Sequence, residues 1–319
     1  MISITIENIK NLVSSYNVNS PVLFLVFNRP NTTIKVFDAI REVKPSRLYI
    51  SSDGPRPKND SDISEINAVR DYVLANIDWN CEVKTLFRES NLGCKDAVSS
   101  GISWFFENED EGIILEDDCL PNQSFFRFCD SLLDKYRHDE RVRHISGVNF
   151  IGNDVVTESS YYFSRFTHVW GWASWKRVWK DYDKNLELLE RFLRSDNLWN
   201  IYPDKRMIEL IKKELMRVKN GELNTWDFQY LFLNLIQNGL TIIPRKSLVE
   251  NIGFGVGATH DHSNGIKLHQ AEEISGELIH PDFLIPQIRF DIDSIIRINN
   301  LSIGSKLKYK ILSFYNKLE

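Results

Sequence analysis

Three adjacent carboxylates follow a short apolar run about a third of the way along this 319-residue chain. Residues 112–115 have the composition of a buried strand, and Glu116, Asp117 and Asp118 come directly after it. Strand alternation would send Glu116 and Asp118 to one side and Asp117 to the other. Mg²⁺ and Mn²⁺ bind few protein oxygens together with substrate phosphates, so the triplet predicts a metal–diphosphate site. A solvated surface turn is the alternative.

Polar residues also follow the two apolar runs nearest the amino terminus. Arg29 comes after the run at 21–28, and Asp53 follows the run at 47–51 in an Asp-Gly-Pro turn sequence. Each has an ordinary interpretation, because Arg29 could be an exposed turn residue and aspartate often precedes glycine in turns. If the runs are parallel strands of one sheet, these residues and the triplet face a single crevice.

The elements that would position these residues alternate in type through the first half of the chain. Strands are predicted at 21–28, 47–51, 81–87, 112–115 and 142–148, and helices at 30–43, 62–76, 93–107 and 125–136. This alternation predicts an α/β fold with a mostly parallel sheet flanked by helices. After about residue 155 it fades; two helices are expected within 186–219, another at 227–238, and a strand at 240–243.

Composition excludes two broad classes of protein. The 39 basic and 44 acidic side chains give a net charge of −5, whereas nucleic-acid binders concentrate Lys and Arg. No run approaches the roughly 20 apolar residues of a membrane-spanning helix, and residues 1–10 lack a signal-peptide pattern, so a cytoplasmic protein is expected. The four cysteines lack Cys-x-x-Cys spacing and are expected to be reduced.

The tryptophans are concentrated, with four of the eight between positions 170 and 179. Trp172, Trp175 and Trp179 are spaced to share one helix face, which is most simply core packing. Trp170 and Trp172 flank Gly171 before that expected helix. Each is therefore assigned either to the core or to a loop whose indole stacks on a sugar ring.

In their order and spacing, these motifs resemble the nucleotide-diphosphosugar glycosyltransferases of the GT-A fold, including family 13 N-acetylglucosaminyltransferases and related bacterial polysaccharide transferases. The resemblance covers about residues 21–260 and is carried by Phe27-Asn28-Arg29-Pro30, Ser52-Asp53-Gly54, Asn91-Leu92-Gly93, Glu116-Asp117-Asp118, Trp170-Gly171-Trp172-Ala173 and Trp226-Asp227. It implies transfer of a sugar, with inversion, from a nucleotide-sugar donor such as a UDP-sugar. The implied acceptor is a saccharide or a lipid-linked saccharide, and the implied cofactor is Mn²⁺ or Mg²⁺.

The same resemblance implies roles for individual residues. The donor-side residues are Asp118 as metal ligand, Asp117 as a partner of the ribose or metal shell, Glu116 beside the donor sugar, Arg29 and Asp53 on uridine and ribose, and Lys95 near the base or diphosphate. Trp170 and Trp172 are the acceptor-side candidates.

Inverting transfer also needs a carboxylate that removes the proton of the acceptor hydroxyl. Asp227 is the candidate base; it stands between apolar neighbours at an expected helix start, where burial would raise its pKa and the helix dipole would lower it. Residues 224–227 are also good capping sequence, so a helix cap is the alternative. The glycine-spaced loop 251–260 resembles a closing loop, from which His260 would reach the metal or diphosphate.

The expected division of the chain is a nucleotide-sugar-binding half at 1–155, an acceptor-binding half at 156–275 and a helical tail at 276–319. Residues 297–319 carry five basic side chains and one acidic one, so the tail either contacts an anionic bilayer or packs as an ordinary helix. Two other classes stay open. A sugar-phosphate nucleotidyltransferase should carry Gly-x-Gly-Thr-Arg where this chain has Asn28-Arg29-Pro30, and a non-catalytic sugar-binding protein would need only the aromatic loop.

Overall fold

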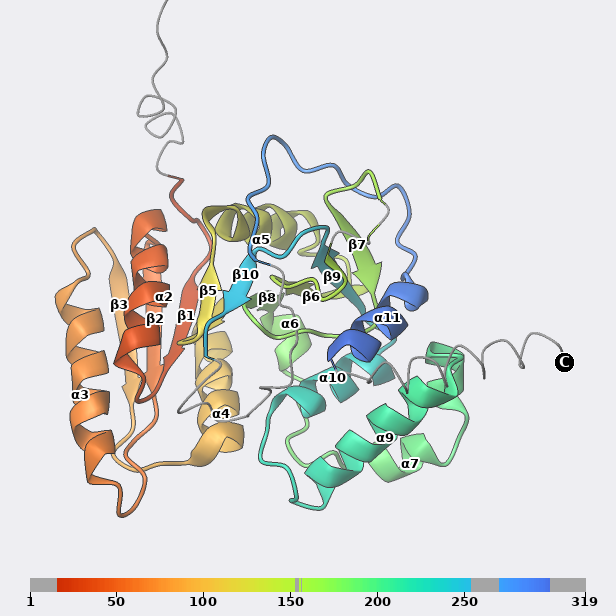
Figure 1. Ribbon diagram of the computed structural model, residues 1–319, viewed down its shortest axis with the longest axis horizontal. Coiled ribbons are helices and arrows are strands. Elements are labelled where there is room, and N and C mark those ends of the chain that lie inside the picture. The colour runs from red at the N-terminus through yellow and green to blue at the C-terminus, as the bar shows by residue number, and fades with distance from the viewer. Residues whose placement is uncertain (1–15, 153–154, 156, 254–269, 299–319) are drawn as a thin grey trace, which may run out of the picture.

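The computed structural model describes residues 16–152, 155, 157–253 and 270–298 (Figure 1). Two predictions lie outside these residues. They are the role of His260 and the basic tail beyond residue 298.

Within the described residues, the strands are β1 (Val22–Val26), β2 (Arg47–Ser52), β3 (Glu82–Phe87), β4 (Glu111–Glu116), β5 (Cys119–Pro121), β6 (Val142–Ser146), β7 (Tyr161–Ser164), β8 (Trp172–Trp175), β9 (Leu240–Pro244) and β10 (Val249–Asn251). The helices of the same part of the chain are α2 (Pro30–Val43), α3 (Asp60–Ala75), α4 (Gly93–Asn108), α5 (Gln123–Lys135), α6 (Lys176–Trp179), α7 (Leu189–Leu193), α8 (Asn197–Ile201), α9 (Lys205–Lys219), α10 (Asp227–Ile236) and α11 (Ile288–Ile298).

Eight of these strands form one mixed sheet in the order β3-β2-β1-β4-β8-β6-β9-β7, counted over the described chain. β1 to β4 are mutually parallel, as are β6 and β9, while β8 and β7 run antiparallel to their neighbours. The predicted α/β class, a mostly parallel sheet flanked by helices, is confirmed. The sheet crosses the expected boundary at residue 155, so the two halves share one framework.

The strand order reverses between β1 and β4. β2 and β3 are added in turn on one side of β1, and β4 is then added on its other side. Right-handed connections therefore place α2 and α3 on one face and α4 on the opposite face. Consistent with this, α2 packs on α3 and α5, and α4 packs on α6 (Figure 1). In open α/β sheets such a reversal opens a crevice beyond the carboxyl ends of the strands.

Continuous apolar runs produce the central strands. Every residue of β1 is buried, and so are residues 112–115 of β4, because helices cover both faces of the sheet. Helix α2 starts at Pro30, whose fixed φ suits the first helical position. Helix α5 is capped by the Asn122 side chain, which accepts a hydrogen bond from the Phe125 amide.

A second hydrophobic core lies among the helices between β8 and β9. Residues of α7, α8, α9 and α10 contribute to it, among them Leu198, Ile211 and Phe232, and Ile295 of α11 joins them. α7, α8, α9 and α10 are called the helical lobe below. Every helix of the described residues is too short or too polar to cross a lipid bilayer.

The predicted helix through the tryptophan cluster is wrong in its first half. Trp172 to Trp175 form strand β8, which fills the sheet between β4 and β6, and α6 begins only at Lys176. The backbone enters β8 through Gly171 at a φ of 60°, a conformation that favours glycine. Side chains of a strand alternate between the two faces of the sheet, so Trp172 and Trp175 lie on opposite faces. Helices cover both faces and bury both indoles, and the resulting apolar spacing of three residues also fits a helix.

Candidate functional site

The reversal between β1 and β4 brings Arg29 and the acidic triplet together. Arg29 lies between β1 and α2, and its Nη1 donates to Asp118 Oδ2 over 2.9 Å. Its Nη2 donates to Asp117 Oδ1. β4 ends at Glu116, so Asp117 and Asp118 lie in the turn toward β5 and both face the same guanidinium. The expected alternation of the three carboxylates therefore stops at Glu116.

The carboxylates differ in burial and in donors. Asp117 is 2% exposed and also accepts from the Phe27 amide over 3.2 Å, while Glu116 and Asp118 are half-buried. Burial, reinforced by the neighbouring carboxylates, raises the pKa of Glu116 to about 8. Burial also raises the pKa of Asp117 to about 6, against the opposing effect of Arg29. Glu116 and Asp117 are therefore harder to ionise than free carboxyl groups, and an added cation would favour their charged forms.

The donor set fits a divalent ion only in company with a ligand. No group of three or more His, Cys, Asp or Glu side chains among the described residues is placed to hold a metal. Mg²⁺ and Mn²⁺ are commonly held by one or two carboxylates plus substrate phosphates, and Asp118 and its neighbours meet that requirement. A Cβ at Gly253 would lie 2.4 Å from Asp118 Oδ2, so the missing side chain keeps the Asp118 carboxylate accessible.

Asp53 stands at the end of β2, but protein donors surround its carboxylate. The amides of Gly54, Leu92 and Gly93 donate to it over 2.9 to 3.2 Å, and so does the Asn91 side chain over 2.9 Å. Desolvation nevertheless raises the Asp53 pKa, with the amide donors opposing that effect. In the structure, the Asp53 side chain holds the loop 91–93 against the end of β2. A contact between Asp53 and uridine or ribose stays a prediction.

Lys95 is placed less favourably for its expected role. It lies in the first turn of α4, where its backbone amide donates to Asn224 Oδ1 over 2.9 Å. Its side chain does not line the cavity described below. Asn224 thus satisfies an amide at the start of α4 from the other half of the chain, which fixes the loop before α10 against the strand edge.

Asp227 is the first residue of α10, and Trp226 rather than Asp227 holds the N-cap position. The Asp227 Oδ1 accepts from the Phe228 amide over 3.0 Å and from the Thr225 hydroxyl. Trp226 is buried and stacks on Trp172 with ring centroids 5.7 Å apart, which anchors the start of the helix. The Asp227 carboxylate is thereby held in a fixed orientation.

These elements enclose one large cavity of about 1160 Å³, which exceeds the usual range for small-ligand sites. Predicted site residues on its wall are Arg29, Asp53, Glu116, Asp117, Asp118, Trp170 and Asp227. Trp172 is fully buried in β8 between His144 and Trp226, so its assignment to acceptor binding is corrected to the core. Trp170 is half-buried on the wall and packs edge-on against Phe150.

Several residues of this wall were not predicted from the sequence. Arg88 directly follows β3, and its guanidinium bonds only the hydroxyls of Ser51 and Ser100, at 3.1 and 2.7 Å, among the bonds of the described residues. Arg56 lies over the Phe27 ring and pairs with the buried Asp62. Applying the strand-end rule to β3 as it was applied to β1, β2 and β4 would have identified Arg88.

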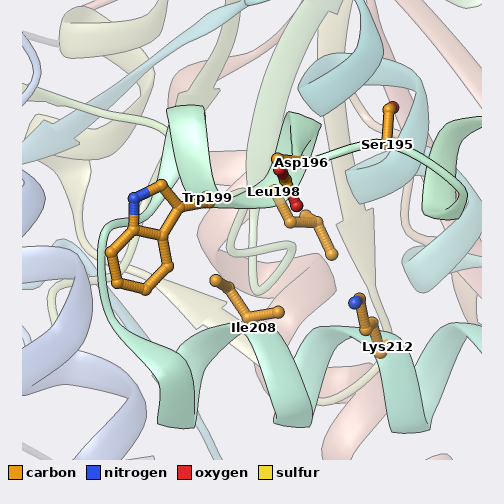
Figure 2. Close-up of a pocket in the computed structure, with 6 residues that line it drawn as sticks. All are labelled: Ser195, Asp196, Leu198, Trp199, Ile208 and Lys212. Carbon is orange, nitrogen blue, oxygen red and sulfur yellow. The ribbon is translucent and has the colours of Figure 1, made fainter.

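A smaller cavity of about 320 Å³ lies on the helical lobe, away from the strand ends (Figure 2). It is lined by Ser195, Asp196, Leu198, Trp199, Ile208 and Lys212. Figure 2 shows the Trp199 indole beside Ile208, with Lys212 on the next turn of the same helix. Trp199 is 52% exposed, so this cavity is a shallow surface feature.

Comparison with known proteins gives no family. No protein-family model matches the chain, and no curated protein matches it. Similar solved structures include HddC from Yersinia pseudotuberculosis, at 12% identity and a TM-score of 0.31, covering 55% of this chain and 86% of that one. HddC complexed with GMP-PN gives 12% identity and a TM-score of 0.32, covering 54% and 86% of the two chains. UDP-glucose pyrophosphorylase complexed with UDP-glucose gives 11% identity and a TM-score of 0.36, covering 71% and 90%.

Proposed function

We propose that this chain is a metal-dependent glycosyltransferase that moves a sugar, with inversion, from a nucleotide-sugar to a saccharide or lipid-linked saccharide acceptor. A UDP-sugar is the proposed donor, and surface polysaccharide synthesis is the proposed setting. The observation that carries the proposal is a single cavity that contains both the acidic triplet at the β1/β4 reversal and the Asp227 carboxylate. The proposed metal–diphosphate residues and the proposed base therefore line the same cavity, which supports their acting on one substrate pair.

The proposed reaction assigns separate work to the two acidic regions. Asp118, with Asp117 or Glu116 beside it, would hold Mn²⁺ or Mg²⁺, which would supply positive charge for the departing diphosphate. The acceptor oxygen bonds to the anomeric carbon as the carbon–diphosphate bond breaks, and Asp227 takes the hydroxyl proton. Thr225 and the Phe228 amide orient Asp227 through its Oδ1, and Trp170 offers an aromatic face for a sugar ring.

A sugar-phosphate nucleotidyltransferase would need a different connection after the first strand. β1 ends at Val26 and α2 begins at Pro30, so residues 27–29 alone join them. This connection contains no glycine and leaves no length for a loop that wraps a triphosphate with backbone amides. The short connection supports transfer from a nucleotide-sugar over synthesis of one.

The test measures the turnover of a panel of nucleotide-sugars with and without Mn²⁺. The quantity measured is the release of nucleoside diphosphate. We expect metal-dependent release that a saccharide acceptor accelerates. Asp227→Asn should keep donor binding but lose about 10²–10⁴-fold in transfer, the usual cost of losing a general base. Asp78→Asn is a matched control, because Asp78 is an exposed carboxylate that pairs with Arg41. Formation of nucleoside triphosphate from donor and pyrophosphate, or absence of metal-dependent nucleotide binding, would contradict the proposal.

A further inference from the structure

Arg29 occupies the acidic triplet in a way that differs from a permanent ion pair. Its backbone is fixed, because its carbonyl accepts from the Thr33 amide over 3.0 Å and from the Thr33 hydroxyl over 2.8 Å at the start of α2. Its side chain is 25% exposed toward the cavity. The guanidinium can therefore change partners by side-chain rotation while the chain around it stays in place.

The two carboxylates that Arg29 joins are held unequally. The Asp117 side chain is 3% exposed, and its second oxygen accepts from the Phe27 amide over 3.2 Å. The Asp118 side chain is 17% exposed, and among the hydrogen bonds of the described residues its second oxygen accepts only from the weakly donating Cys119 thiol at 3.4 Å. Breaking the bond from Arg29 to Asp118 is therefore less costly than breaking the bond to Asp117.

We propose that Arg29 is an exchangeable counter-ion of the triplet, which releases Asp118 when a divalent cation and a diphosphate bind together. The inference rests on the proposed function and assigns Arg29 a further task within it. A cation at Asp118 would repel the Nη1 group that lies 2.9 Å from the Asp118 carboxylate. The incoming diphosphate offers that group a new charge-assisted hydrogen bond, while Nη2 stays on Asp117. Metal and nucleotide should then bind cooperatively.

The experiment measures Mn²⁺ binding by electron paramagnetic resonance and by calorimetry, with and without UDP. Arg29→Met removes the competing cation, so Mn²⁺ alone should bind about tenfold more tightly than to the wild type, while the tightening by UDP should shrink about tenfold. Because the coupling is reciprocal, the effect of Mn²⁺ on UDP affinity should shrink by the same factor. Arg29→Lys keeps the charge but lacks the planar fork of the guanidinium, so its Mn²⁺ affinity and UDP coupling should fall between those of the wild type and Arg29→Met.

Arg47→Met is the matched control. Arg47 is the first residue of β2, at the amino end of the strand and away from the triplet, and it pairs with Glu109 over 2.6 Å. Its loss should therefore leave the Mn²⁺ affinity and the UDP coupling unchanged. The inference is overturned if Arg29→Met binds Mn²⁺ no more tightly than the wild type, or if the UDP coupling of both Arg29 variants is unaltered. Absence of Mn²⁺ and UDP binding from the wild type and the variants alike would overturn the proposed function as well.

Discussion

Asp53 at the end of β2 and Asp118 at the end of β4 are aspartates on the same edge of one sheet, yet their surroundings differ. The Asp53 carboxylate accepts from the backbone amides of the following turn and of residues 92 and 93. Asp118 accepts from the side chain of Arg29 and from a thiol. Both lie on the wall of the large cavity, so exposure to that space alone does not separate them.

The difference lies in what each set of donors can do. Backbone amides cannot leave a carboxylate unless the loop that carries them moves, so the bonds of Asp53 are part of the fold. A guanidinium at the end of a flexible side chain can leave without disturbing the backbone. A strand-end carboxylate therefore becomes a binding group when its donors are replaceable, and a structural group when they are not.

Asp118→Asn probes this distinction with the largest expected effect. Loss of even an indirect partner of a metal ligand costs up to about 100-fold in metal affinity, so loss of the proposed ligand should weaken Mn²⁺-dependent UDP binding by at least that factor. The urea unfolding midpoint should change little, because removing the Asp118 charge relieves its repulsion with Asp117 while it weakens the ion pair with Arg29. Calorimetry and urea denaturation measure the two quantities. Unchanged metal-dependent affinity would place the metal elsewhere.

Asp53→Asn should give the opposite result at the other strand end. An amide offers one acceptor oxygen where the carboxylate offers two, and its NH₂ group would face amide donors of the loop 91–93. We expect a loss of about 1–3 kcal/mol in the free energy of unfolding, the cost of leaving buried donors without partners. Mn²⁺ affinity should be unchanged, because no hydrogen bond joins Asp53 to Arg29 or the triplet among the described residues. A fall in Mn²⁺ affinity equal to that of Asp118→Asn would erase the distinction between the two ends.

The sequence was sufficient to locate the polar residues at the strand ends, but not the hydrogen-bond partners that surround them. Apolar runs located β1, β2 and β4, because local composition determines a strand that is buried on both faces, and turn residues located the helices between them. β3 is an edge strand without a fully buried residue, and its place in the alternation of strands and helices indicated it. Apart from the Gly54 amide, the donors around Asp53 come from a loop about 40 residues away, and Asn224 reaches the start of α4 from the other half of the chain. Such pairings depend on tertiary packing and leave no local pattern.

Strand β8 shows the same limit. Its tryptophans are spaced for a helix, but the gap between β4 and β6 must be filled by a strand, and this segment fills it. The short strands β5 and β10 pair only with each other within the described residues, and neither run of three residues was predicted. Periodicity fails where an element is too short or is buried on every side.

The large cavity and the helical-lobe cavity can be compared in the same way as the two strand ends. Substitution of Trp199 in the helical-lobe cavity has the smallest expected effect on nucleotide binding. The helical-lobe cavity of about 320 Å³ has an exposed Trp and polar neighbours, as a sugar site could, but it lacks the bonded guanidinium–carboxylate cluster of the larger cavity. If function depends on replaceable donors at the strand ends, Trp199→Ser should leave nucleotide binding and donor turnover unchanged.

The same variant should lower the free energy of unfolding by about 1 kcal/mol, the typical cost of a single substitution, because about half of the Trp199 surface is already in water. Urea denaturation and the donor-turnover assay measure both predictions. Trp170→Ser supplies the contrast, since Trp170 lies on the wall of the large cavity and should weaken acceptor binding when removed. A loss of acceptor affinity in Trp199→Ser as large as that in Trp170→Ser would show that acceptor recognition extends onto the helical lobe, beyond the reach of the β1/β4 crevice.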